Sequence, residues 1–268
     1  MKHKKLSIAC GIIFVIGLIL AGLGLATHGS KAIMIDNKMH LYIQQQYKSA
    51  ENVPHSVQNL TINAKNIDVT IQKGNHFSIS ALSLVKKADV QVSGNTLTLS
   101  AQGMGVDAAG IDLNLRQAVQ EQVVITVPSS YTLTKFHLTS TGTVMKNDQV
   151  QLQGLKVDSA KLNLANSWTG IQDTQFVNSL DVTSTGASSN FELTNSASSL
   201  AKTNHFTISD GNLGIYVPAQ FTLTGKNTSW QWNGKEISVT HPMEISKKSS
   251  GQKVTITANN ANVSLGNN

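Results

Sequence analysis

The stretch that decides the fold is Leu60-Thr-Ile62-Asn-Ala-Lys-Asn-Ile67-Asp-Val69, in which two alternating apolar pairs flank a gap of four residues. Alternation with a period of two is typical of a strand that buries one face. The same form recurs at 90–99, 155–164, 206–215 and 254–263. Each gap opens with Asn, Ser, Asp or Thr, whose short side chains bond to turn backbones, so we expect turns at 63–66, 93–96, 158–161, 209–212 and 257–260. The pattern predicts an all-β, solenoid-like (β-helix-like) stack of short strands.

A longer motif appears twice, ninety positions apart. I-T-V-P-S-S-Y-T-L-T at 125–134 matches I-Y-V-P-A-Q-F-T-L-T at 215–224. The proline ends one strand because it cannot donate a hydrogen bond to a ladder, and the aromatic residue begins the next strand. The match suggests duplication of one structural unit. The shorter units are spaced irregularly, which predicts a degenerate solenoid.

The N-terminus carries an almost continuous apolar run over residues 6–26. Twenty-one helical residues span roughly 30 Å, the thickness of a bilayer core. Lysines precede the run, so we expect residues 1–5 in the cytoplasm, a single-pass transmembrane anchor at 6–26 and the rest outside the cell membrane. The alternative is a cleaved signal peptide with its cleavage motif at 24–26, although the apolar part of such peptides is usually shorter.

The remaining chain divides into a juxtamembrane linker at 27–56 and a repeat β domain at 57–268. Within the linker, Asp36 could cap a short helix that runs to Tyr47. Pro54 marks the entry to the β region.

Composition excludes several classes of protein. Charged residues make up 13% of the 268 residues and aromatic residues 5%, as in exported β-rich proteins. The net charge is +6, but three N-terminal lysines contribute to it, and Arg116 is the only arginine, so nucleic-acid recognition is not expected. Cys10 is the only cysteine, which we interpret as a small apolar residue of the anchor because no apolar segment precedes it as a lipoprotein signal requires. The exported part then has neither disulfide nor thiol nucleophile.

Three short phrases carry a family resemblance. They are V-Q-N-L-T-I-N-A-K-N-I-D-V-T-I at 57–71, the strand 123–128 followed by L-T-S-T-G at 138–142, and L-D-V-T-S-T-G at 180–186. They resemble the bacterial putative adhesin domain, an envelope domain, over residues 57–268. The resemblance implies an all-β, solenoid-like stack behind an N-terminal anchor. It implies no catalytic residues, because the family has no agreed set.

Motifs that would indicate chemistry are missing from the sequence. No two of the eight histidines stand at i, i+2 or i, i+4 with a carboxylate beside them, and no G-x-S-x-G elbow occurs. The acids occur singly instead of converging as calcium loops require. We therefore predict no catalytic residue, metal or cofactor.

Trp230 and Trp232 are the candidate ligand contacts. At i, i+2 on a strand they point the same way, and with Trp168 they are all the tryptophans. On an exposed face, two indoles could stack on sugar rings. Their phase also continues that of Phe221 and Leu223, which favours packing into the core at the end of the stack.

These observations predict a membrane-anchored, non-enzymatic extracytoplasmic protein that acts in surface adhesion or in envelope scaffolding and sensing. Its partners would be the membrane and a cell-wall polymer or an envelope protein. The alternative is a cell-wall glycan-binding or glycan-active protein. A glycan-active site would need clustered carboxylates, and the 15 acids are spread thinly.

Overall fold

The protein is described by a computed structural model. It describes residues 15–19, 22, 33–35, 41–49, 56–83, 85–104, 111–112, 121–143, 148–193, 199–216, 219–246 and 252–266. From residue 33 onward, every regular secondary-structure element in the described part of the chain is a strand, which confirms the all-β prediction.

The predicted transmembrane anchor at 6–26 is not found. Of that segment only 15–19 and 22 are described, and they are helical. No helix within the described ranges is long and apolar enough to cross a membrane, so the predicted single-pass topology and cell-membrane localisation are corrected. Residues 1–5, Cys10 and the motif at 24–26 lie outside the described residues.

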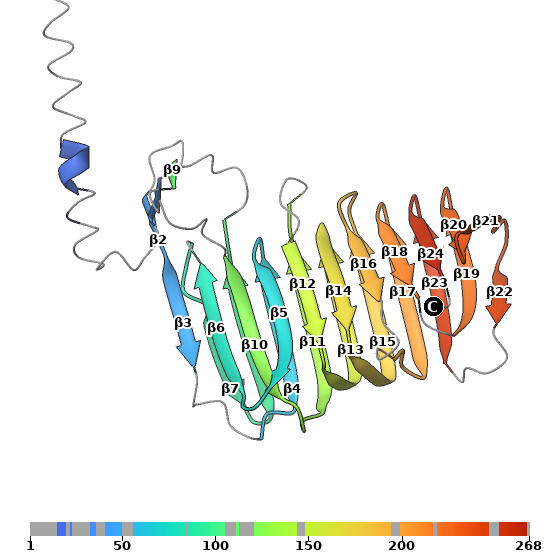
Figure 1. Ribbon diagram of the computed structural model, residues 1–268, viewed down its shortest axis with the longest axis horizontal. Helices are drawn as coiled ribbons and strands as arrows, with labels where there is room; N and C mark the ends of the chain where they lie inside the picture. Colours follow the sequence, from blue (N-terminus) through green and yellow to red (C-terminus); the bar gives the residue numbers. More distant parts are fainter. Residues whose placement is uncertain are drawn as a thin grey trace, which may run out of the picture.

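Two large mixed sheets form the body of the molecule. Figure 1 shows their strands side by side across an elongated body, from β3 and β7 at one end to β21 and β22 at the other. Sheet I has eleven strands, in the spatial order β21 (Lys235–Ile237), β20 (Ser229–Trp232), β24 (Asn262–Leu265), β18 (Asn212–Ile215), β16 (Asn190–Leu193), β14 (Ser167–Gln172), β12 (Asp148–Gln153), β5 (Asp68–Gly74), β10 (Gln122–Pro128), β6 (Ser78–Ser83) and β3 (Gln45–Ser49). Sheet II has ten, in the order β22 (Met243–Ser246), β19 (Gln220–Lys226), β23 (Lys253–Asn259), β17 (Thr203–Ser209), β15 (Gln175–Thr185), β13 (Lys156–Ala165), β11 (Leu133–Thr141), β4 (Asn59–Lys65), β8 (Thr96–Gln102) and β7 (Asp89–Ser93).

A third, small sheet contains β2 (Leu41–Ile43), β1 (Ile33–Ile35) and β9 (Ile111–Asp112). The short helix predicted from Asp36 to Tyr47 is therefore wrong, because β2 and β3 occupy its second half. β3 pairs with β6 and thereby joins sheet I.

The solenoid prediction is also wrong, because the chain advances by one strand pair at a time only from β11–β12 to β17–β18. β4 and β5 lie between β8 and β10 on one side and β11 and β12 on the other, all of which come later in the chain. Similarly, the C-terminal β23 and β24 lie between β17–β18 and β19–β20. Parallel pairing in the middle gives way to antiparallel pairs at the ends, such as β7 with β8 and β19 with β22. The result is two mixed sheets with crossovers.

The duplicated sequence motif coincides with these crossovers. Its first copy runs from β10 in sheet I to β11 in sheet II, and its second from β18 in sheet I to β19 in sheet II. In each case the chain re-enters sheet II on the far side of an intervening strand pair. The motif thus marks where the chain steps over a pair.

The apolar faces of the two sheets form one core. Strands alternate between buried and less buried residues as predicted, for example in β8 and β10. Phe191 of sheet I and Phe206 of sheet II meet edge to face across the core, with ring centroids 5.5 Å apart. Leu162, predicted to point inward, is fully buried, and the adjacent Lys161 is exposed.

Residues with a positive φ form the corners between the sheets. Asn66, Asp210 and Asn260 stand there with φ of 53°, 58° and 49°. Asn and Asp tolerate this left-handed region better than other residues with a β-carbon. The Asn260 amide donates to the Lys226 carbonyl at 3.0 Å, so backbone pairing continues around the corner.

Four of the five predicted turns are therefore confirmed, in narrower form, and one is wrong. The turn within 93–96 is an antiparallel hairpin between β7 and β8. Residues 158–161 instead lie inside β13, next to a register shift between Val157 and Ser159. That irregularity keeps the strand continuous where the sequence suggested a turn.

Candidate functional site

The two predicted ligand contacts lie on β20 and face the core. Trp230 is only 2% exposed. Trp232 is partly buried, and its ring packs edge to face on Phe221 at 5.7 Å between centroids. Packing at the end of sheet I thus accounts for both indoles, and a ligand role for them stays a prediction.

The outer face of sheet I carries a different feature, a row of residues with two glycines. Register places one residue from each of six neighbouring strands in this row, which we call the glycine row: Gln151, Gly170, Glu192, Gly214, Ser264 and Gln231. Because a glycine has no side chain, the sheet surface is low at two places in the row. Aromatic rings from neighbouring positions occupy both places.

Trp168 lies over the first glycine. Both residues belong to β14 and face outward two positions apart, while Ser167 and Thr169 are buried between the sheets. A β-carbon built on Gly170 would lie 3.5 Å from Cη2 and 3.7 Å from Cζ3 of the indole. The indole therefore lies above Gly170 with room for about one methyl group between them, and it remains partly exposed.

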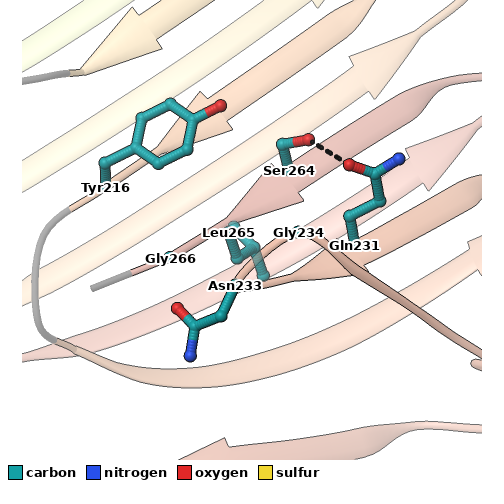
Figure 2. Close-up of a pocket in the computed structure, with 7 residues that line it drawn as sticks. All are labelled: Tyr216, Gln231, Asn233, Gly234, Ser264, Leu265 and Gly266. Atoms are coloured by element: carbon teal, nitrogen blue, oxygen red, sulfur yellow. Dashed lines mark hydrogen bonds between the residues drawn. The ribbon is translucent and has the colours of Figure 1, made fainter. Parts of the chain in front are cut away.

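Tyr216 lies over the second glycine. A β-carbon on Gly214 would approach Cε2 of the Tyr216 ring to 3.0 Å, and one on Gly266 would approach Cδ1 to 3.2 Å. Both distances are tighter than normal packing, so the ring position depends on glycine at these two sites. Figure 2 shows Tyr216 at the end of its strand beside Ser264, Gly266 and Asn233.

The two rings approach the glycine row from opposite directions. Trp168 precedes Gly170 by two residues, and Tyr216 follows Gly214 by two residues. Their strands β14 and β18 are separated only by β16, so the two glycines lie about 10 Å apart across the sheet. Glu192 of β16 stands between them, and its Cγ lies 3.6 Å from the β-carbon position of Gly214.

Each ring borders a hollow in the surface. The hollow beside Trp168 has a volume of about 70 Å³ and is lined by Gln151, Leu152, Gln153, Trp168, Gly170 and Gln172. The hollow beside Tyr216 has a volume of about 340 Å³ and is lined by Tyr216, Gln231, Asn233, Gly234, Ser264, Leu265 and Gly266. Ser264 Oγ donates to Gln231 Oε1 at 3.3 Å, as Figure 2 shows. Side-chain amides thus border both rings, and a serine hydroxyl borders the hollow beside Tyr216.

Glu192 is the single carboxylate of the glycine row. It is partly buried, and within the described part of the chain it makes no hydrogen bond or ion pair. The other outward carboxylates on strands of sheet I are Asp68, three strands away, and Glu236, four strands away. These offsets correspond to about 14 Å and about 19 Å across the sheet. The carboxyl pairs of glycosidases are closer, at most about 10 Å apart.

No metal centre is evident either. Among the described residues, no group of three or more His, Cys, Asp and Glu side chains could hold a metal ion. His137 contacts Asn163, with 3.1 Å between Nε2 and Nδ2, on the outer face of sheet II.

The sequence contains a local signal for this face. Trp168 and Gly170 form a W-x-G motif, and Gly214 and Tyr216 form its reverse, G-x-Y. On a strand, residues two apart share a face. Ile171 and Ile215 fix the inward phase, so the aromatic residue and the glycine must both face outward.

Comparison with known proteins gives no close relative. No family model and no curated protein matches the sequence. Three solved structures match, among them a "putative cell adhesion protein" from Clostridium sporogenes, with a TM-score of 0.39 and 11% identity over 84% of this chain and 100% of that one. The others are a "putative adhesin" from Bacteroides fragilis (0.36, 11%, 84% and 96%) and a "putative lipid binding protein" from Parabacteroides distasonis (0.35, 6%, 83% and 96%). Identities and TM-scores this low show no family and carry no ligand to this chain.

Proposed function

We propose that the protein is a non-enzymatic, adhesin-type binding protein that holds a glycan chain, such as a cell-wall polymer, on the outer face of sheet I. The observation that carries the proposal is the pair of aromatic rings, Trp168 and Tyr216, seated on glycines about 10 Å apart in one row.

Sugar chemistry fits such a surface. A pyranose ring presents axial C–H groups on a flat face, and these pack favourably on the electron-rich face of an aromatic ring. The two platforms are separated by about the length of a disaccharide unit, so one chain could contact both. Gln151, Gln231 and Asn233 offer amide donors and acceptors for the hydroxyl groups at the edges of the sugars.

Binding is favoured over hydrolysis by the solitary position of Glu192. Cleavage of a glycosidic bond requires two carboxyl groups across the scissile bond. The strands of this face supply one in the row, and the next ones stand three and four strands away. A shallow, open face also suits weak contacts that are multiplied over many copies of a protein or many units of a polymer.

The test is titration of the full-length protein with neutral glycan oligomers of defined length, followed by calorimetry and by tryptophan fluorescence. Removing either platform by Trp168→Ala or Tyr216→Ala should weaken binding by about twofold to tenfold, because stacking on one ring contributes roughly 0.5–1.5 kcal/mol. Val124→Ala is the matched control, since Val124 faces outward on sheet I, three strands from Trp168. Binding that both aromatic variants leave unchanged, or release of reducing ends by the wild-type protein, would overturn the proposal.

A further inference from the structure

Glu192 has surroundings that leave its charge unbalanced. Its side chain is partly buried, its Cγ and the Tyr216 ring both lie close to Gly214, and its carboxylate has no hydrogen-bond or ion-pair partner among the described residues. An unpaired carboxylate keeps its full capacity to accept hydrogen bonds from a ligand. Such a site gains the most from a ligand that brings its own positive charge.

The rest of the glycine row is uncharged. Gln151, Ser264 and Gln231 carry only amide and hydroxyl groups, and the two glycines carry none. The negative charge is therefore concentrated at one point, between the two aromatic platforms. A hydrogen bond from a cationic donor to this carboxylate would be shorter and stronger than one between neutral groups.

We propose that this face selects glycans whose amino sugars carry a free, protonated amine, that is, de-N-acetylated hexosamine polymers, with Glu192 accepting a hydrogen bond from the ammonium group. This inference rests on the proposed function and deepens it. A single carboxylate does not make a metal site, because calcium takes six to eight oxygen ligands and the row offers few others. Polyanionic polymers, such as uronans and phosphate polymers, would be repelled by the same charge.

The experiment compares two probes that differ only in acetylation. Full-length protein is titrated with chitosan hexamer and with chitin hexamer at pH 6, first for the wild type and then for Glu192→Gln. We expect the wild type to bind chitosan hexamer about tenfold more tightly than chitin hexamer, because a hydrogen bond to a charged group exceeds a neutral one by roughly this factor. Glu192→Gln should abolish this preference.

Glu236→Gln is the matched control, because it is the same substitution on the same outer face but on β21, four strands away. It should retain the preference. Raising the pH through the pKa of the sugar amine should remove the preference in the wild type only. Raising the ionic strength should reduce it, because exposed charges are screened by salt.

The outcomes separate the two proposals. If neither hexamer binds, the proposed function itself fails. If both hexamers bind equally and depend on Trp168 and Tyr216, the glycan-binding proposal stands and the amine selectivity is overturned. If chitosan is preferred equally by wild type and Glu192→Gln, the charge of Glu192 is not responsible and the inference is overturned. If a lysine-rich peptide binds the wild type with the same affinity as chitosan and displaces it, but does not displace chitosan from Glu192→Gln, the site recognises cations of any polymer. The assignment to amino sugars is then overturned.

Discussion

Val182 and Thr183 allow the packing of the two sheets to be tested with an almost isosteric pair of residues. They are neighbours on β15, but Val182 is 2% exposed, in the core, and Thr183 is exposed on the outer face of sheet II, between Asn163 and Thr207. Changing each to Asp places the same carboxylate on opposite faces of one strand. The difference in stability then reports the face alone.

We expect Val182→Asp to lower the free energy of unfolding by about 5 kcal/mol or more, because it removes about 1.5–3 kcal/mol of apolar burial and leaves a carboxylate without a partner, at several kcal/mol. This is comparable with the whole stability of an ordinary domain, about 5–15 kcal/mol. Thr183→Asp should change the stability by at most about 0.5 kcal/mol, as exposed substitutions usually do. The assay is urea denaturation followed by far-UV circular dichroism.

A milder exchange keeps the test informative if Val182→Asp does not fold. Val182→Thr inserts only a hydroxyl into the core and should cost about 1–3 kcal/mol, whereas Thr183→Val should be nearly neutral. Lys161 and Leu162 form a similar pair, but Lys161 is in register with Asp181, so an acidic substitution there would also place two like charges side by side. Equal destabilisation by Val182→Thr and Thr183→Val would refute the assignment of the two faces.

Three further predictions follow from particular residues. In a calorimetric titration, Gly214→Ala should weaken glycan binding more than Gly170→Ala. The methyl group added at Gly214 would lie 3.0 Å from the Tyr216 ring, whereas the one added at Gly170 would be in ordinary contact with Trp168. Equal losses of affinity would argue against a platform that depends on glycine. Asn260→Ala should lower the free energy of unfolding by about 1–2 kcal/mol, because φ is 49° there and alanine is strained in the left-handed region. Asn260→Gly should lower it by less. A larger loss for Asn260→Gly than for Asn260→Ala would contradict the role of the corner. Burial raises the pKa of the Tyr131 hydroxyl above its usual value of 10.0, so the folded state holds this proton more tightly than the unfolded state does. The stability that Tyr131 contributes is therefore complete below pH 10 and is lost as the pH rises through the folded pKa. In alkaline denaturation, Tyr131→Phe should lose less stability than the wild type above pH 10.

The faces of the strands could be predicted from the sequence because burial imposes a period of two on each strand separately. Leu162 and Lys161 illustrate this, since their opposite exposures follow from their own neighbours. Corner residues such as Asn66 and Asp210 could also be predicted, because a left-handed backbone restricts residue type locally.

The order of the strands could not be predicted, because it is set by pairing between segments far apart in the chain. Nothing within 252–266 indicates that β23 and β24 pair with β17 and β18 on one side and with β19 and β20 on the other. The candidate site could not be predicted for a related reason. Trp230 and Trp232 are a local pair in the sequence, whereas Trp168 and Tyr216 are brought near one row only by the register of β14, β16 and β18.

The C-terminal strands β23 and β24 lie between strands that are synthesised before them, and this has a consequence for biosynthesis. A nascent chain that ends before residue 252 has made β17 to β22 but lacks the strands that join β17 to β19 and β18 to β20. Folding from the N-terminus therefore halts with two pairs of open sheet edges, and the last segment acts as the closing piece. A premature stop codon just before residue 252 would detach the end of the molecule from β19 to β22 along with the missing strands. A separate peptide of residues 252–266 could restore it by strand addition, the same chemistry that lets one chain complement another at an open edge.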